Sequence, residues 1–205
     1  MSVETPSNSG RVRKFQSAFW LPPRQARYEE LLQKRDHFVR MQLEIGAGVG
    51  LHAIRCAQES PDTLLVALER TRNRFALLEQ RVRQHDLPNL LEVHADAVPW
   101  VTHLDKAVKF SKIWILYPNP EPSNRNQRWV NSPFFPELLQ RLNSEGELEF
   151  ATNLSWYADE VERQAQEVWQ LKVFREKFQD SPRTHFEKKY LGRGEVCWRL
   201  ILTLC

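Results

Sequence analysis

From residue 41 onward, short apolar runs alternate with segments of helical periodicity, and this alternation constrains the fold more than any other feature of the sequence. Strands that alternate with helices pair in parallel, and the helices cover both faces of the resulting sheet. The predicted strands comprise residues 41–45, 63–69, 89–95, 112–117, 146–152, 171–178 and 195–204. The predicted helices comprise residues 51–60, 72–86, 132–143 and 155–169.

The last two predicted strands differ from the others, because only a polar segment, residues 180–194, lies between them and no helix is predicted there. Two strands without a crossover helix are expected to pair as an antiparallel hairpin at one edge. The sequence therefore predicts an α/β, Rossmann-like fold: a mostly parallel, seven-stranded sheet with helices on both faces and a C-terminal antiparallel hairpin. Sheets of this kind bind ligands at the carboxyl ends of their strands.

The chain has 205 residues, of which 41% are hydrophobic, and this suits one globular core. Residues 1–40 are expected to form a flexible basic arm and a first helix, and residues 41–205 the main domain. The formal net charge of +3 permits an anionic partner without requiring one. The cysteines lack metal-ligand spacing, and neither a signal peptide nor an apolar run of ~20 residues is recognisable. We therefore expect a cytoplasmic protein without a metal and without a membrane association.

The strongest local signal is the glycine cluster Gly46, Gly48 and Gly50, between the first strand and the helix after it. Glycine lets a ligand approach the backbone where a Cβ would collide, and the following helix offers N–H groups and a positive dipole end to a carboxylate. Glu69 ends the second strand, where an acid is the usual partner of two ribose hydroxyls. Asp96 follows the third strand, within expected reach of an adenine amine.

These acids also have purely structural interpretations. In that case Glu44 is a solvated carboxylate at a strand end, while Glu69 and Asp96 cap the helices that follow them. Three acids at successive strand ends together favour a nucleoside ligand. S-adenosylmethionine (SAM) is favoured over NAD, because Leu51 stands where the pattern G-x-G-x-x-G has its third glycine.

The sequence resembles the bacterial tRNA (guanine-N7)-methyltransferases, which are class I SAM-dependent methyltransferases. The resemblance covers most of the chain and depends on EIGAGVG, ALER, HADA, YPNPEP, ATN followed by YADEV, and RTHFEKKYLGRG. It implies a methyltransferase domain over residues 41–205, SAM as the cofactor, tRNA as the partner, and a monomer or homodimer. The SAM contacts that it implies are Glu44, Gly46, Gly48, Glu69, Asp96 and Asn119. The substrate contacts that it implies are Ser123, Asn153, Thr184 and Glu187, with Asn119 also at the catalytic position.

The loop after the fourth strand departs from the family pattern P-D-P-W-P-K, because residues 118–123 read PNPEPS. Asn119 stands at the position of the catalytic aspartate, and Asn153 at that of a second substrate-binding aspartate. Guanine N7 carries an unprotonated lone pair, so methyl transfer depends chiefly on holding N7 in line with the methyl group. An amide at residue 119 still accepts a hydrogen bond from guanine, but roughly half as strongly as a carboxylate. We therefore expect weakened guanine recognition, or a different acceptor, before a complete loss of activity.

Three alternatives stay open. Asn119-Pro120 is similar to the N-P-P-Y box of enzymes that methylate exocyclic or amide nitrogens, which points to another acceptor, such as an exocyclic amine, a small molecule or a protein. The two Asp-to-Asn departures also fit a SAM- and RNA-binding protein without turnover, and the loop by itself fits a rigid connection without chemistry. If RNA is the substrate, cations are expected around one cleft mouth. These cations are Arg11, Arg13, Lys14, Arg125, Arg128 and Arg183.

Overall fold

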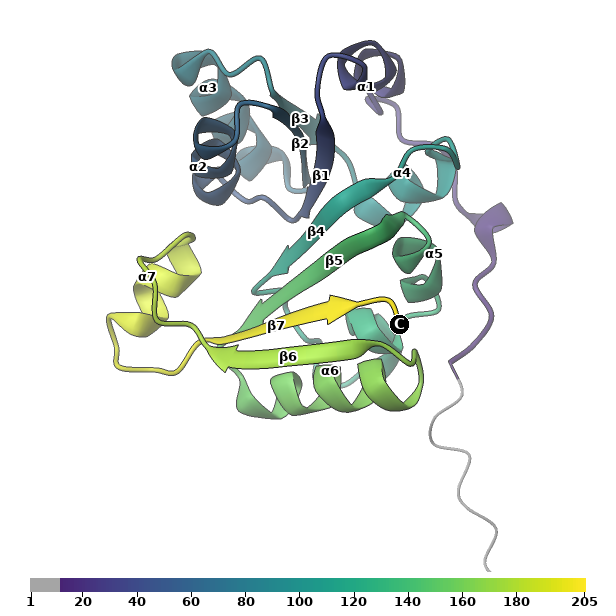
Figure 1. Cartoon of the computed structure of the whole chain (residues 1–205), viewed down its shortest axis with the longest axis vertical. Helices are drawn as coiled ribbons and strands as arrows, with labels where there is room; N and C mark the ends of the chain where they lie inside the picture. Colours follow the sequence, from purple (N-terminus) through teal and green to yellow (C-terminus); the bar gives the residue numbers. More distant parts are fainter. Residues whose placement is uncertain (1–11) are drawn as a thin grey trace, which may run out of the picture.

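The computed structural model describes residues 12–205, which form one sheet of seven strands in the order β3-β2-β1-β4-β5-β7-β6 (Figure 1). The strands are β1 (Arg40–Ile45), β2 (Thr63–Glu69), β3 (Leu90–His94), β4 (Phe110–Leu116), β5 (Leu142–Thr152), β6 (Lys172–Lys177) and β7 (Trp198–Thr203). Strands β1 to β5 are parallel, whereas β7 is antiparallel to both β5 and β6. The predicted fold class is thus confirmed, including the antiparallel C-terminal strands.

Helices cover both faces of this sheet. Within residues 12–205 the α-helices are α1 (Tyr28–Arg35), α2 (Leu51–Glu59), α3 (Arg72–His85), α4 (Ala97–His103), α5 (Phe135–Leu139), α6 (Ser155–Glu167) and α7 (His185–Leu191). One core lies under α2 and α3, and the other lies under α1, α4, α5 and α6. Helix α7 lies apart from both layers, beside the ends of the strands (Figure 1).

Alternate residues of the central strands supply the two cores. Leu64, Val66 and Leu68 of β2 belong to the core under α1, α4, α5 and α6, whereas Leu65 and Ala67 belong to the core under α2 and α3. This follows from the period of two in a strand. The chain order reverses between β1 and β4, and in open α/β sheets ligands bind at the carboxyl ends of the strands at this point.

Helix α7 shows that the prediction of no helix between the last two strands was wrong. Thr184 caps the helix, because its Oγ1 accepts a hydrogen bond from Glu187 N at 3.0 Å. Glu187 is the one buried residue among the seven of this helix. The segment therefore lacks the apolar periodicity by which a helix is recognised in a sequence.

Two further helices differ from the prediction. No helix is predicted at α4, where Pro99 interrupts the pattern. Pro99 lies in the first turn, however, where a backbone N–H has no partner within the helix, so the missing N–H of proline costs no hydrogen bond. Asp96 caps this helix, accepting from Val98 N at 2.9 Å. Helix α5 is shorter than the predicted 132–143, because β5 already begins at Leu142.

The segment before β1 packs on the face covered by α4 and α5. Leu31 of α1 is fully buried, the ring of Phe15 lies 5.5 Å from that of Phe134, and His103 Nε2 lies 2.6 Å from Trp20 O. Residues 1–11 of the expected arm, Arg11 among them, lie outside the described residues, and the domain boundary at residue 40 stays a prediction. No helix of residues 12–205 is long and apolar enough to cross a membrane.

Candidate functional site

The glycine cluster forms a tight turn at the carboxyl end of β1. The amides of Gly46 and Ala47 both donate to Leu68 O, at 2.8 and 2.9 Å, which fixes the turn to β2. Gly46, Gly48 and Gly50 have φ angles of 79°, 60° and 84°, in the left-handed region that residues with a Cβ rarely adopt. The turn ends at Gly50, the N-cap residue of α2.

The three glycines have different surroundings. A Cβ at Gly46 or at Gly48 would meet no atom within 4 Å, whereas a Cβ at Gly50 would lie 2.4 Å from Leu78 Cδ1 of α3. Gly46 and Gly48 also line a pocket, and Gly50 does not. The first two glycines thus leave room for a ligand, while the third allows α2 and α3 to pack closely.

Glu69 and Asp96 both bind backbone amides. Asp96 caps α4, as its structural interpretation predicts, whereas the N-cap residue of α3 is Thr71 and not Glu69. Glu69 is 3% exposed, and its two carboxylate oxygens accept from Gly48 N at 2.9 Å and from Thr71 N at 2.7 Å. Glu69 therefore fixes the glycine turn to the start of α3. A carboxylate oxygen accepts more than one hydrogen bond, so these bonds leave Glu69 able to bind a ribose and Asp96 able to bind an adenine. Both contacts stay predictions.

Glu44, unlike a solvated strand-end acid, is buried in an ion pair with His52. The two side chains are each 3% exposed, and His52 Nδ1 lies 3.0 Å from Glu44 Oε2. The other ring nitrogen of His52 lies 3.2 Å from Cys56 Sγ. Burial by itself lowers the pKa of His52, but the Glu44 carboxylate and the hydrogen bonds to Cys56 and Glu44 raise this pKa to about 10. His52 is therefore a cation at neutral pH.

Sequence reasoning did not single out His52, although a signal exists. His52 is the second residue of the helix that follows the glycine turn, so the strand–turn–helix geometry returns it beneath the end of β1, where Glu44 lies. Its ring also meets the ring of Trp114 of β4 edge-on at 5.0 Å. His52 thus links the first strand, its helix and the neighbouring strand β4.

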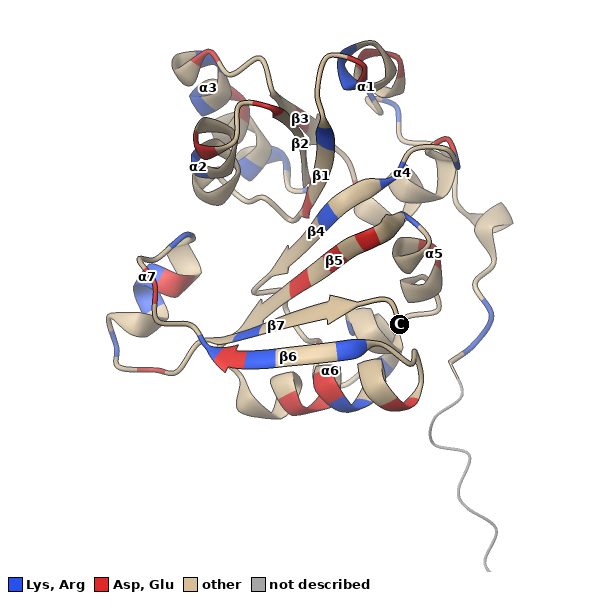
Figure 2. Cartoon of the chain, viewed as in Figure 1, with Lys and Arg blue, Asp and Glu red and all other residues tan. Residues whose placement is uncertain are grey.

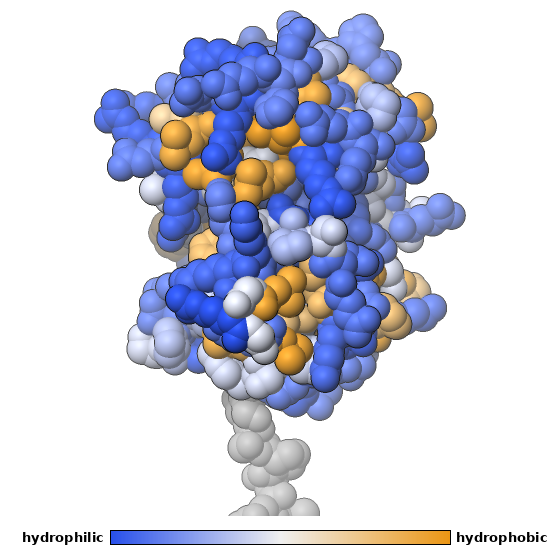
Figure 3. Space-filling view, turned by 90° about the vertical axis from the view of Figure 1, so that its left-hand side faces the viewer, coloured by the Kyte–Doolittle hydropathy of each residue, from blue (hydrophilic) through white to orange (hydrophobic). Residues whose placement is uncertain are grey.

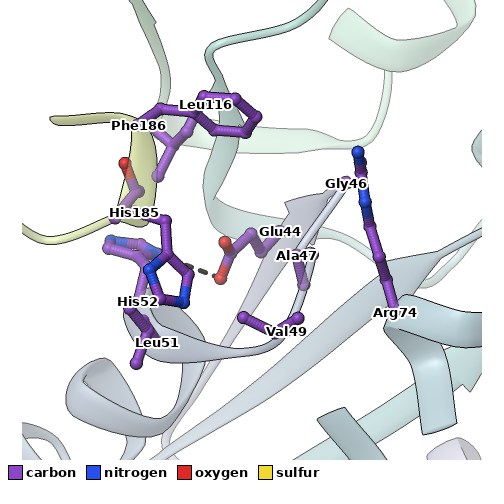
Figure 4. Close-up of a pocket in the computed structure, with 12 residues that line it drawn as sticks. Glu44, Gly46, Ala47, Val49, Leu51, His52, Arg74, Leu116, His185 and Phe186 are labelled. Carbon is purple, nitrogen blue, oxygen red and sulfur yellow. Dashed lines mark hydrogen bonds and ion pairs between the residues drawn. The ribbon is translucent and has the colours of Figure 1, made fainter. Parts of the chain in front are cut away.

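The pocket lies between the glycine turn and α7. Figure 3 faces this side of the molecule, where apolar areas interrupt a hydrophilic surface. Figure 4 shows Glu44 and its contact to His52 on one side of the pocket, Leu116 and Phe186 across from them, and Arg74 reaching in from α3. The lining residues are Glu44, Gly46, Ala47, Gly48, Val49, Leu51, His52, Arg74, Leu116, Thr184, His185 and Phe186. Of the residues predicted from the sequence, the pocket brings together Glu44, Gly46, Gly48 and Thr184.

The loop after β4 begins with a strained residue, Tyr117, whose φ is 53°. Asn119, two residues on, is exposed. Ser123 Oγ donates to Glu121 Oε1 at 2.7 Å, so Ser123 and Glu121 bind each other. Arg128 closes the loop by donating to the carbonyls of residues 120 and 122, at 3.1 and 2.8 Å.

The remaining predicted substrate contacts lie in polar networks. Asn153 Nδ2 donates to Glu195 Oε2 at 2.9 Å, a contact that an aspartate at residue 153 would turn into a repulsion. Glu187 is fully buried and paired with Arg183 at 2.7 Å. Arg183 in turn pairs with Glu149 of β5, which Lys112 also neutralises at 2.9 Å. This network fixes the start of α7 to the sheet.

The cations expected around one cleft mouth are not gathered there. Arg128 and Arg183 have side chains only 14% and 15% exposed and bind carboxylates within the protein. Arg125 likewise lies 3.3 Å from Glu160. Arg13 and Lys14 belong to the segment that runs past α5, on the side of the molecule away from α7, and Arg11 lies outside the described residues (Figures 1 and 2). Among residues 12–205, no group of three or more His, Cys, Asp or Glu side chains is arranged to hold a metal ion.

The strand order, the glycine turn after β1 and the acids at the ends of β1 to β3 define the class I methyltransferase fold. Solved structures agree with this. The 16S rRNA methyltransferase KamB superposes with a TM-score of 0.67 at 19% identity, covering 95% of this chain and 97% of that chain. The precorrin-6y C5,15-methyltransferase of Geobacter metallireducens GS-15 superposes with a TM-score of 0.60 at 13% identity, covering 92% of this chain and 95% of that chain.

Sequence comparisons show the family. A family model described as "Putative methyltransferase" matches residues 39–200. The tRNA (guanine-N(7)-)-methyltransferase of Anaeromyxobacter dehalogenans is 32% identical over 170 residues, 80% of this chain and 85% of that protein. Those of Thermotoga maritima and Neorickettsia sennetsu are 28% and 33% identical over 78% and 70% of this chain. The chain belongs to the tRNA (guanine-N(7)-)-methyltransferase family. Its matched part spans 52% and 65% of the Thermotoga and Neorickettsia proteins.

Proposed function

We propose that this chain is a cytoplasmic, SAM-dependent methyltransferase that transfers a methyl group to guanine N7 of tRNA. The observation that carries the proposal is the pocket at the end of β1, where two open glycine positions face a buried carboxylate and α7. Family membership supports the choice of acceptor, because relatives that align with most of this chain carry the name tRNA (guanine-N(7)-)-methyltransferase.

The pocket fits SAM in its chemistry. The positions of a Cβ at Gly46 and Gly48 are open, so the carboxylate of an amino acid is able to reach the N-terminal end of α2, whose first N–H groups have no partner within the helix. Glu44 supplies a negative charge for the ammonium group, since only one of its oxygens contacts His52. Glu69 and Asp96 are the proposed partners of the ribose and the adenine. When bound, SAM supplies an electrophilic methyl group.

The task left to this chain's own residues is to orient the acceptor. Guanine N7 needs no base, because its lone pair is free at neutral pH, so positioning supplies most of the rate. Asn119 is the proposed acceptor of a hydrogen bond from guanine, and it is exposed at the end of β4. Ser123, Asn153, Thr184 and Glu187 stay the proposed substrate contacts. For the buried Glu187, that contact would first require a rearrangement around Arg183.

The direct test is to incubate the purified protein with methyl-labelled SAM and an unmodified tRNA pool, to digest the RNA, and to separate the nucleosides. Label in 7-methylguanosine is the expected result. Label in another nucleoside would contradict guanine N7 while keeping an RNA methyltransferase. No label in RNA, with SAM binding confirmed by calorimetry, would contradict tRNA as the acceptor.

A second candidate, a SAM-dependent enzyme for another acceptor or a binding protein without turnover, follows from the altered loop. Glu121 and Ser123 stand in place of the tryptophan and the lysine of the family pattern, and their side chains bind each other. The double variant Asn119→Asp with Ser123→Lys distinguishes an enzyme for another acceptor from a binding protein without turnover. Restored tRNA methylation from an inactive parent would favour lost turnover, whereas label in a metabolite panel with the unchanged chain would favour another acceptor.

A further inference from the structure

Three aromatic rings gather where β4 ends and α7 crosses it. The ring of Tyr117, directly after β4, lies 6.2 Å from Phe186 and 5.8 Å from Tyr190, measured between ring centroids. Phe186 and Tyr190 lie 6.1 Å apart, with their planes 20° from parallel. The planes of Tyr117 and Phe186 are also only 25° from parallel. Two of the three pairs are therefore stacked, and the third, Tyr117 with Tyr190, is tilted by 37°; we call the three rings the stack.

One ring of this stack is partly exposed and borders the pocket. Phe186 is 39% exposed and lines the pocket together with Leu116 and Thr184. Figure 4 shows its side chain beside Leu116, across the pocket from Glu44. An aromatic ring in this position is able to stack on a planar base, and the two tyrosines, which do not line the pocket, pack against it.

The stack is held by both of its supporting elements. Tyr117 is fixed at the end of β4, where its N–H donates to Ala151 O at 2.8 Å and its φ of 53° turns the chain sharply. The cap on Thr184 and the buried pair of Glu187 with Arg183 hold the start of α7. The surface is thus formed before a ligand arrives, which reduces the entropy lost on binding.

We propose that Phe186, backed by Tyr117 and Tyr190, is the stacking surface for the planar base that accepts the methyl group. The inference rests on the proposed function and names a subsite within it. The strand order β3-β2-β1-β4-β5 separates this stack from the acids assigned to the nucleoside of the cofactor, which follow β2 and β3. The stack lies instead beside β4 and the loop that carries Asn119.

Charge beside the stack favours a nucleotide over an uncharged planar ligand. Lys188 and Lys189 follow Phe186 on α7 and are exposed. Arg74, also exposed, reaches into the pocket from the opposite side (Figure 4). An aromatic face with cations at its rim matches a base flanked by phosphates.

The test compares Phe186→Leu, which keeps the apolar volume without a π face, with Phe186→Tyr. Loss of one base–aromatic stack is expected to lower kcat/KM for tRNA roughly five- to hundredfold in Phe186→Leu, and no more than about threefold in Phe186→Tyr. SAM affinity and Tm are expected to stay unchanged. The matched control is Phe174→Leu, because Phe174 is 59% exposed on β6 and does not line the pocket. Equal losses in Phe186→Leu and Phe186→Tyr, or no loss in either, would overturn the inference.

A second readout does not depend on turnover. Saturation-transfer NMR with guanosine 5′-monophosphate, in the presence of S-adenosylhomocysteine, is expected to show transfer to the base proton H8 in the unchanged protein and weak transfer in Phe186→Leu. If tRNA is not methylated but this Phe186-dependent transfer persists, the proposed function fails while the subsite stands. If tRNA is methylated and transfer is the same in Phe186→Leu, the subsite is wrong while the function stands.

Discussion

His52 is charged because of where the chain folds, not because of its neighbours in sequence. Glu44 precedes it by eight residues across the glycine turn, and the two side chains meet with almost no exposure to water. Removing one partner of a buried ion pair strongly destabilises a protein, because the other partner is left as an unpaired buried charge. The same pair binds one carboxylate oxygen of Glu44 at the pocket wall and leaves the other oxygen available to a ligand.

Replacing His52 by glutamine is expected to remove a pH dependence of stability. The pKa of His52 is raised from 6.5 to about 10, so its contribution is fully present below pH 6.5 and is lost as the pH rises through 10. This contribution is on the order of a few kcal/mol. Urea unfolding of both proteins between pH 6 and 10 checks it: the gap in unfolding free energy should narrow as pH rises. Parallel curves would contradict the charged pair.

The glycines of the turn are expected to separate ligand binding from folding. Gly48→Ala places a methyl group in open pocket space at a φ of 60° and costs about 1 kcal/mol of stability from strain alone. Gly50→Ala adds a contact of 2.4 Å to Leu78 and is expected to cost more. Calorimetry should show weaker SAM binding for Gly48→Ala, whereas Tm should fall further for Gly50→Ala. A Tm loss as large in Gly48→Ala as in Gly50→Ala would contradict this division.

At this scale the sequence predicts what depends on local geometry. Gly46 and Gly48 are recognisable because a turn between a strand and a helix needs their backbone freedom. The sequence does not reveal that Glu44 pairs with His52 or that Asn153 pairs with Glu195, because the two partners of each pair come from different parts of the fold. The second pairing gives a physical reason for an amide at residue 153, since it faces a carboxylate.

Among the elements, the β–α alternation was sufficient to predict the sheet, but not the short helices at the site. Helix α7 is held by a cap and by the buried Glu187 instead of an apolar face. Its position depends on the ion pair between Arg183, just before the helix, and Glu149 of β5, which Lys112 of β4 also contacts. Both strands lie far away in the sequence. A pattern of hydrophobic residues carries no information about such contacts.

The anchor of α7 is expected to weaken in acid. Burial by itself raises the pKa of Glu149, but Arg183 and Lys112 lower it to about 2. The stability it contributes is present above pH 4.5 and is lost as pH falls through 2, and it amounts to roughly 3 kcal/mol. Glu149→Gln should therefore be less stable at pH 7 and flatter in its acid dependence, as measured by urea unfolding at pH 2 to 7.

The control for this change is Glu79→Gln on α3, whose exposed partner Arg83 lies one turn away. A surface pair of this kind contributes about 0.5 kcal/mol. If Glu149→Gln and Glu79→Gln shift stability equally, the network around Arg183 does not anchor α7.

On the scale of the whole molecule, the cations able to contact a large anion are not gathered at one place, and some of them border the pocket on α3 and α7. The arginines near the Asn119 loop are neutralised within the protein, whereas Arg13 and Lys14 are exposed on the side of α4 and α5 (Figure 2). The pocket and this N-terminal segment are separate surfaces, and a substrate as extended as tRNA is able to contact both. Phosphate contacts by the segment would then set affinity, while the pocket sets the position of the base.

Neutralising Arg13 and Lys14 together by alanine is expected to weaken tRNA binding without changing SAM affinity. Each lost phosphate contact lowers the slope of log Kobs against log salt by about 0.9 if the contacted RNA is duplex-like. Filter binding between 50 and 200 mM salt measures this slope. The matched control is Arg55→Ala with Arg83→Ala, two exposed cations on α2 and α3 paired with Glu59 and Glu79.

Both double variants remove two positive charges, so the formal net charge falls from +3 to +1 in each. If only the Arg13 and Lys14 variant loses slope, the N-terminal segment contacts phosphates. If both lose it equally, the attraction comes from the net charge of the whole protein, and the segment has no specific role. Because the comparison holds total charge constant, the difference between the two slopes isolates where on the molecule the RNA lies.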